Sequence, residues 1–174
     1  MTEVTVRRVG EDEARTCAFA LADVLVDCVD GGASVGFLSP LARERAVAFW
    51  TGVAGAVERG ERALLVAEDP GGRIVGTVQL VLALPENQPH RADVVKMLVH
   101  RSARRQGIGE RLMSAVDQVA RDEGRSVLVL DAVTGGDAER LYERAGWQRV
   151  GVVPRYALMR DGEPCATTFF YKHL

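Results

Sequence analysis

The chain has 174 residues, of which 47% are hydrophobic and 26% charged, and its formal net charge is −2. This length fits one ordinary globular domain, so we predict a single domain over residues 1–174 with a sizeable core. Because acidic and basic residues are interspersed, the chain lacks the strong field that draws a protein to nucleic acid or to a membrane surface, and we expect neither as a partner.

The amino terminus and the cysteines bear on location. The amino terminus has no apolar segment of the kind found in signal peptides, and no apolar run approaches the roughly 20 residues that span a membrane. Cys17, Cys28 and Cys165 are odd in number and widely spaced. We therefore expect reduced, mostly buried thiols in a cytoplasmic protein. Without clustered Cys and His ligands, we expect no metal site.

The first part of the chain alternates between strand and helix patterns. Apolar and polar residues alternate over residues 4–9, as in a half-buried strand, and residues 11–28 carry apolar residues at helical spacing. A second helix is predicted to begin with Ser39 as its N-cap and Pro40 as its first residue, and to end at Gly60.

The middle of the chain is predicted to form a strand-rich unit. Residues 63–68 and 73–84 are expected to be strands joined by a hairpin with the turn sequence Asp-Pro-Gly-Gly. A strand over 92–99, a helix over 108–123 and a short buried strand over 126–131 follow. Their β-α-β order predicts a right-handed parallel crossover.

The chain is predicted to end with a helix and an antiparallel strand pair. The helix ends at Gly146, and strands over 147–153 and 167–172 are linked through a turn at Asp161 and Gly162. Seven strands and four helices in this order predict an α/β fold.

The most informative segment is Arg104-Arg105-Gln106-Gly107-Ile108-Gly109, between an apolar strand and an amphipathic helix. A helix that begins after a glycine-containing turn presents open backbone N–H groups at its positive end, and such a site binds phosphate or pyrophosphate. Gly107 and Gly109 have no β-carbon to keep a ligand from the backbone. A local basic cluster is expected around the loop, formed by Lys96, His100, Arg101, Arg104 and Arg105.

Two other kinds of phosphate loop are excluded. The chain has no G-x-x-x-x-G-K-[ST] segment, so the lysine and hydroxyl of a P-loop are missing. The dinucleotide fingerprint needs three spaced glycines, and only two are present here.

The remaining pattern, R-x-x-G-x-G preceded by Met97, Leu98 and Val99, resembles motif A of the GCN5-related N-acetyltransferases, the GNAT superfamily. Val99 stands five positions before Arg104, as in that motif. The chain departs from the motif at Arg101, where the family often has a proline that stiffens the loop.

A second segment strengthens the resemblance. Residues 137–147 resemble the family pattern A-x-x-L-Y-x-x-x-G-[FW], and Ala138, Leu141, Tyr142 and Ala145 fall on one face of a helix that Thr134 is expected to cap. The family usually has an asparagine seven positions before the tyrosine, where this chain has Gly135.

The resemblance spans essentially the whole chain and implies the GNAT fold: a central, mixed and mostly antiparallel sheet of about seven strands, with about four helices packed on both faces. It also implies acetyl-CoA as the acyl donor. The backbone of Met97, Leu98 and Val99 would pair with the pantetheine arm, and the Leu98 N–H would polarise the thioester carbonyl. The pyrophosphate would be held around Arg104 and by the N–H groups of Arg105, Gln106, Gly107, Ile108, Gly109 and Glu110.

Two side chains are candidates for proton transfer. By the resemblance, Tyr142 would protonate the departing sulfur; otherwise it is an aromatic residue of the core. Asp131 ends a short strand, where open α/β sheets bind ligands, and it would orient Tyr142 or accept the proton of the substrate. An aspartate at a strand end equally often serves only the next turn.

The acceptor site is expected between the first two helices and the last strands. Asp27, Asp30 and Phe37 would suit a small cationic amine, although a glycine-rich segment such as this one is also typical of a plain loop. Arg155 would meet a carboxylate on the substrate. The arrangement is also similar, on weaker patterns, to the bacterial group that contains tabtoxin-resistance acetyltransferase, which implies an amino-acid-like or antibiotic-type acceptor.

We therefore predict a cytoplasmic acetyl-CoA-dependent N-acetyltransferase that acts by direct transfer on the primary amine of a small molecule, as a monomer or homodimer. Two alternatives stay open: acetylation of a protein N-terminus or lysine, and a non-catalytic acyl-CoA-binding sensor domain.

Overall fold

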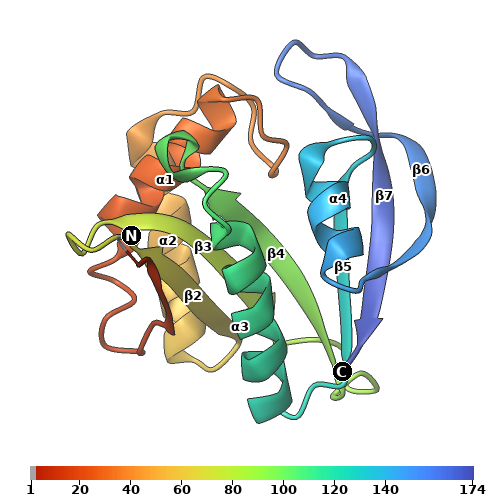
Figure 1. The fold of residues 1–174 in the computed structure, drawn as a ribbon. Helices are drawn as coiled ribbons and strands as arrows, with labels where there is room; N and C mark the ends of the chain where they lie inside the picture. The colour runs from red at the N-terminus through yellow and green to blue at the C-terminus, as the bar shows by residue number, and fades with distance from the viewer. Residues whose placement is uncertain (1–2) are drawn as a thin grey trace.

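The structure is a computed structural model and describes residues 3–174. Its elements, in chain order, are β1 (Thr5–Arg8), α1 (Ala18–Asp30), α2 (Arg43–Glu58), β2 (Arg62–Glu68), β3 (Ile74–Val81), β4 (Arg91–Val99), a 3₁₀ turn (Arg101–Ala103), α3 (Ile108–Asp122), β5 (Val127–Val133), α4 (Asp137–Arg144), β6 (Gln148–Leu158) and β7 (Pro164–His173). The strands form one seven-stranded sheet in the order β1-β2-β3-β4-β5-β7-β6 (Figure 1).

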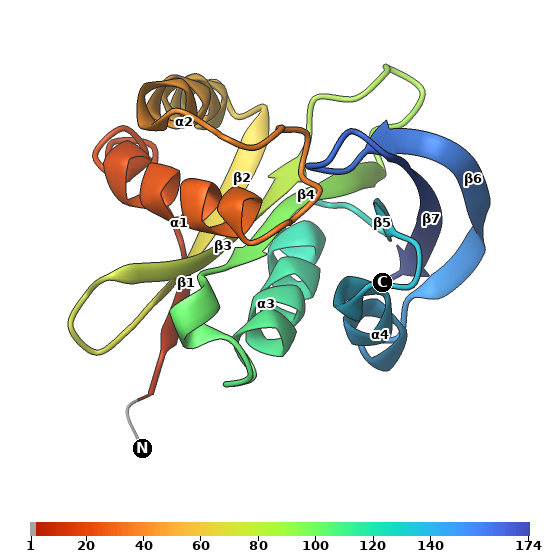
Figure 2. The same ribbon diagram turned by 90° about the horizontal axis from the view of Figure 1, so that it is seen from above.

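Helices cover the sheet on both faces. Helices α1 and α2 lie on one face, and α3 and α4 on the other (Figure 2). Helix α3 buries the stripe that its sequence predicts, made of Ile108, Leu112, Met113, Val116 and Ala120. Only β4 and β5 are parallel, and the other neighbouring strands are antiparallel. The predicted fold, a mostly antiparallel mixed sheet between two helical layers, is confirmed.

Two predicted helix starts were wrong. Residues 11–17 form turns, and α1 begins only at Ala18. The Glu13 carboxylate pairs with Arg7 of β1, with Nη2 and Oε1 2.5 Å apart, and this ion pair holds the segment before α1 against the sheet. The second helix, α2, begins at Arg43 rather than at Ser39 and Pro40. Leu41 is buried in the cluster formed by α1 and α2, and the chain before it has no regular secondary structure.

The predicted cap of α4 was also wrong. Gly136 occupies the N-cap position, and the Thr134 hydroxyl instead lies 2.9 Å from the Thr168 hydroxyl of β7. The predicted C-terminal end is confirmed, since Gly146 has the left-handed φ of +84°.

Strand β4 separates from β5 soon after they meet. The two strands pair only where Arg91, Ala92 and Asp93 face Val127, Leu128 and Val129, and they diverge toward their carboxyl ends (Figure 1). On its other side β4 carries a bulge, in which Lys96 and Met97 together oppose Val78 of β3. Lys96 has a φ of +54°, which is rare for a residue with a side chain. The fork and the bulge lie side by side and shape the cleft described below.

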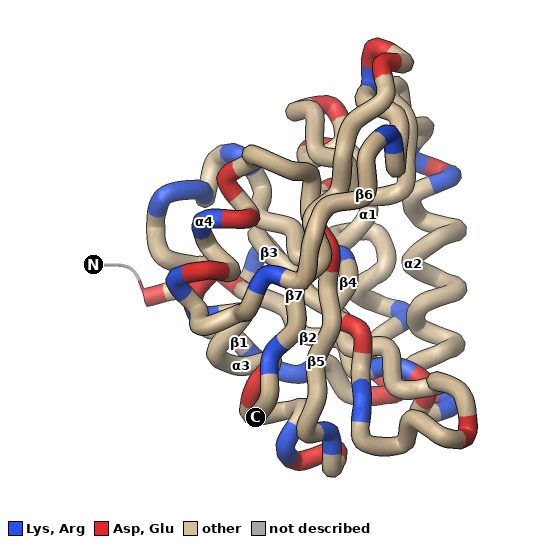
Figure 3. The backbone as a smooth tube through the Cα atoms, turned by 90° about the vertical axis from the view of Figure 1, so that its right-hand side faces the viewer, with Lys and Arg blue, Asp and Glu red and all other residues tan. Residues whose placement is uncertain are grey.

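Acidic and basic residues are interspersed along the backbone, as the sequence indicated (Figure 3). Within residues 3–174, no helix has both the length and the apolar character needed to cross a membrane.

Candidate active site

The loop before α3 presents backbone donors. Gly107 has a φ of +73° and precedes the first helical residue, Ile108, while Arg105 also adopts a left-handed conformation. The first bond inside the helix runs from the Arg111 N–H to the Gly107 carbonyl at 3.1 Å, so the N–H groups of Ile108, Gly109 and Glu110 have no partner within the helix. No side chain of residues 3–174 caps this end. The geometry is that of an anion site at a helix amino terminus.

The two glycines of the loop have different roles. In the part of the chain that the structure describes, no heavy atom beyond the neighbouring residues lies within 4 Å of the place where a β-carbon on Gly107 would stand, so this face of the loop is open. A β-carbon on Gly109 would lie 3.0 Å from Leu141 Cδ2 of α4. The absence of a side chain at Gly109 therefore lets α3 and α4 pack closely. It also leaves the backbone of the loop accessible to a ligand.

Asp27 anchors the turn that leads into the loop. Its two carboxylate oxygens accept hydrogen bonds from the Arg101 backbone N–H at 2.8 Å and from Arg101 Nε at 2.9 Å. Burial acts to raise the pKa of Asp27, but these bonds outweigh it and leave the pKa below its ordinary value. Because both oxygens are engaged, we assign Asp27 to positioning the loop and leave it out of the proposed acceptor pocket.

We expect Asp27→Ala to raise the Kd for acetyl-CoA about tenfold, because hydrogen bonds to a charged group are worth about 1.5–3 kcal/mol and the loop loses two. Titration calorimetry measures the change. Asp23→Ala is the matched control, since Asp23 lies on the same helix and pairs only with Arg43 at the surface. An unchanged Kd together with a raised KM for the amine would return Asp27 to the acceptor site.

Asp131 lies in the fork between β4 and β5. A cavity of about 160 Å³ there is lined by Asp93, Val94, Val95, Val129, Leu130, Asp131 and Phe169. The Asp131 side chain reaches solvent, yet the surrounding protein raises its pKa through desolvation, an effect that the ammonium of Lys96 opposes. A carboxylate with a raised pKa at the mouth of a cleft is suited to accept a proton.

Tyr142 lies near the same fork, on α4. Its ring packs against Trp147 and Phe170, with centroids 6.1 Å and 6.0 Å away. Burial, and to a lesser degree the charge of Asp131, raise the pKa of Tyr142 to about 12. The hydroxyl thus stays protonated at neutral pH. Among residues 3–174 it makes no hydrogen bond with Asp131, so the two groups interact only through charge.

The predicted cofactor strand stands beside this pair. Leu98 is buried toward α1 and α2, whereas Met97 and Val99 pack on the α3 side. The Val99 carbonyl accepts from Arg104 Nε at 3.1 Å and from Cys28 Sγ at 3.4 Å. Beyond Asp93 the edge of β4 that faces β5 carries no strand partner.

The remaining acceptor candidates, Phe37, Asp30 and Arg155, are not among the residues that line the cavity at Asp131. The Phe37 ring lies edge-on to Phe49 of α2 at 5.2 Å. The backbone carbonyl of Asp30 accepts from Arg160 Nη1 at 2.9 Å, which ties the end of α1 to the β6–β7 hairpin. Arg155 is exposed on β6, where it adopts a φ of +55°, beside Tyr156. Tyr156 in turn packs on Phe169.

Sequence reasoning placed Lys96 in the wrong group. We grouped it with the basic residues of the phosphate loop, but its Nζ lies 5.6 Å from the centre of the Phe49 ring, on the α2 side of the sheet. Strict alternation along β4 would turn Lys96 toward α3, together with Ala92 and Val94. The bulge breaks the alternation and could not be read from the sequence.

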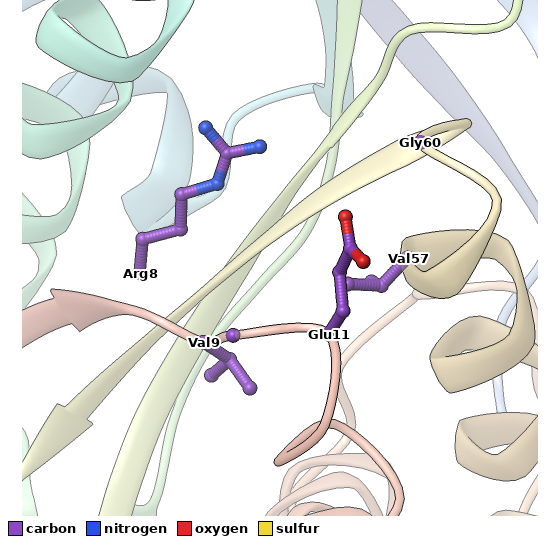
Figure 4. A pocket seen from close by; sticks show the side chains of 6 residues that line it. Arg8, Val9, Glu11, Val57 and Gly60 are labelled. Atoms are coloured by element: carbon purple, nitrogen blue, oxygen red, sulfur yellow. The ribbon is translucent and has the colours of Figure 1, made fainter.

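A larger hollow of about 310 Å³ lies elsewhere, where the end of β1 meets the end of α2 (Figure 4). The Arg8 guanidinium that borders it is paired with Glu123 at 2.6 Å. None of the predicted site residues lines this hollow.

Two comparisons with known sequences give matches. The family described as Acetyltransferase (GNAT) domain matches residues 60–149. An uncharacterized N-acetyltransferase of Azospirillum brasilense is 37% identical over 134 residues, which cover 75% of this chain and 76% of that protein.

Two solved structures share the fold. An N-acetyltransferase from Staphylococcus aureus Mu50 superposes with a TM-score of 0.79 at 16% identity, covering 99% of each chain. The yncA protein of Salmonella typhimurium, solved with its cofactor acetyl-CoA, gives a TM-score of 0.79 at 18% identity, covering 99% of this chain and 95% of the other. At these identities the likeness shows the fold alone.

Proposed function

Because the chain belongs to the GNAT family of acetyltransferases, we propose that it moves the acetyl group of acetyl-CoA directly to the primary amine of a small molecule. The observation that carries the proposal is the juxtaposition of an open helix amino terminus with the fork between β4 and β5, where Asp131 lies on β5 and Tyr142 on the adjacent helix α4. Cys17 and Cys28 are buried and free, which agrees with a reducing compartment, and we propose a cytoplasmic location.

The residues present fit acetyl-CoA. The open N–H groups of the loop would hold the pyrophosphate, with Arg104 and Arg105 adding positive charge. The unpaired edge of β4 near Met97, Leu98 and Val99 would receive the pantetheine arm. The yncA structure, which contains acetyl-CoA, supports this choice by likeness of fold.

The chemistry follows from the placement of three groups. When bound, acetyl-CoA supplies an acetyl thioester that an amine can attack. We propose that Asp131 accepts the proton of the amine, that the Leu98 N–H donates to the carbonyl oxygen, and that Tyr142 gives its proton to the departing sulfur. The pKa of Asp131 is raised, which brings its basicity closer to neutral pH, and Tyr142 enters the reaction protonated.

We expect acetyl-CoA to bind with a Kd in the micromolar range and Gly107→Trp to abolish the binding, because an indole on the open face of the loop would occupy the anion site. Titration calorimetry measures this. Gly124→Trp is the matched control: Gly124 has a similar φ of +69° and the same open surroundings, but it follows the far end of α3. Equal loss in both variants, or no binding by the wild type, would contradict the proposal.

The alternatives are tested with a panel of amines in which thiol release is followed. Acetylation of free amines supports the proposal. Acetylation of peptides alone would mean a protein acceptor, and binding of acetyl-CoA without any turnover would mean a sensor domain.

A further inference from the structure

The chain contains only two lysines against twenty arginines, and the two lysines differ in environment. Lys172 on β7 is fully partnered, with Nζ 2.5 Å from Asp117 Oδ2 and 2.8 Å from the Ala145 carbonyl. Lys96 forms neither an ion pair nor a hydrogen bond with any residue of 3–174, although it is partly buried. Burying an ammonium without a partner costs free energy. We therefore expect the Lys96 ammonium to pair with an anionic group of a bound ligand.

The fold holds the Lys96 ammonium in place. The bulge turns its side chain toward α2, where Nζ lies 5.6 Å from the Phe49 ring centre. A β-carbon at Gly36 would lie 3.6 Å from Nζ, so the segment between α1 and α2 passes close by. The strained φ of +54° at Lys96 is compatible with a functional position, because strained backbone conformations cluster at such sites.

The charges around Lys96 leave an excess of positive charge. Arg62, whose Nη1 is 2.6 Å from Gln79 Oε1, repels Lys96 and, together with burial, lowers its pKa. Asp131 is the carboxylate that acts against this shift. Asp93 also lines the fork but is already paired with Arg91. Glu61 acts on Arg62 but is paired with Arg59. Among residues 3–174, the Lys96 ammonium is thus left without an ion-pair partner, and a ligand with one negative charge would supply one.

Resting on the proposed acetyl transfer, we propose that the acceptor is a small free amino acid, whose carboxylate binds Lys96 while its amine faces Asp131. The cavity of about 160 Å³ that holds Asp131 is also lined by Val95, the residue before Lys96, so its β4 wall ends next to the bulge. Its volume is below the roughly 300 Å³ of sites for drug-sized ligands, which favours a small acceptor. A peptide would lack the free carboxylate next to the reacting amine. The inference therefore moves the predicted contact with the substrate carboxylate from Arg155 to Lys96, and the predicted contact with the amine from Asp27 and Asp30 to Asp131.

The test compares free L-amino acids with the corresponding C-terminal amides and with dipeptides of the same first residue. We expect the amides and dipeptides to show a kcat/KM at least about tenfold lower than the acids, since a charge-assisted contact is lost. Lys96→Met should raise the KM for the acid about tenfold and leave the KM for the amide unchanged. Any change of kcat that comes from the altered pKa of Asp131 should be the same for acid and amide. Lys96→Arg should restore part of the affinity for the acid.

Arg45→Met is the matched control, because Arg45 also stacks on a phenyl ring of this wall, that of Phe37 at 5.6 Å, but is exposed. Its KM for the acid should not change. The inference is overturned if amides or dipeptides react as well as acids, if Lys96→Met affects acid and amide equally, or if no amino acid is acetylated. Calorimetry with acetyl-CoA, run in parallel, separates these outcomes from failure of the proposed transferase function, which would show as lost cofactor binding.

Discussion

Replacing Asp131 by asparagine is expected to lower kcat about 10²–10⁴-fold at saturating acetyl-CoA, the usual range for removing a general base. The reason is that the amide cannot take up the proton of the amine, although it fills the same space. Burial raises the pKa of Asp131 and the Lys96 ammonium limits the rise, so the carboxylate is more basic than an exposed one. Thiol release with the best amine of the panel measures the loss.

The stability of the same variant separates catalysis from folding. The pKa of Asp131 is higher in the folded protein than its ordinary value of 3.8, so ionisation of this group opposes folding above the folded pKa. Asp131→Asn should therefore be at least as stable as the wild type at pH 7. The difference should vanish as the pH falls below 3.8, where the carboxyl is protonated in both states. A less stable variant with normal kcat would instead make Asp131 a structural residue of the strand end.

The turn before α3 could be predicted from the sequence because its determinants are local. Gly107 adopts a positive φ, and the helix begins at the next residue. The residues that determine both features lie within a few positions of each other. The same holds for Gly146 at the end of α4. The order of strands and helices followed from hydrophobic periodicity, which also acts over short distances.

The surroundings of Asp27 and Lys96 could not be predicted because the contacts that determine them are long-range. Asp27 carries a carboxylate that could bind an amine, yet both of its oxygens accept hydrogen bonds from Arg101, 74 positions away. Lys96 belongs in sequence to the basic cluster, yet a bulge opposite Val78 turns it to the other face. In both cases a side chain of the right type was visible in the sequence, but the contact that fixes its role was not.

Tyr142→Phe is the second large effect expected, a fall in kcat of about 10²-fold or more from loss of the proton donated to sulfur. The substitution removes only the hydroxyl group, and the ring contacts with Trp147 and Phe170 remain. Because burial raises the pKa of Tyr142 to about 12, the phenol holds its proton throughout the neutral range and is available as an acid. Absorbance titration of the phenols in the wild type and the variant identifies the signal of Tyr142.

Three measurements together decide the role of Tyr142. The Kd for acetyl-CoA should be unchanged in Tyr142→Phe, because the loop before α3 and the edge of β4 are untouched. Tyr171→Phe serves as the control. The Tyr171 hydroxyl donates to Gln148 at 2.5 Å between the neighbouring strands β7 and β6, and its removal should leave kcat unaltered. If kcat is unchanged in Tyr142→Phe as well, the tyrosine is an aromatic residue of the core, and solvent protonates the thiolate. If kcat falls together with the affinity for acetyl-CoA, the hydroxyl positions the cofactor rather than supplying the proton, because a pure general acid contributes only in the transition state.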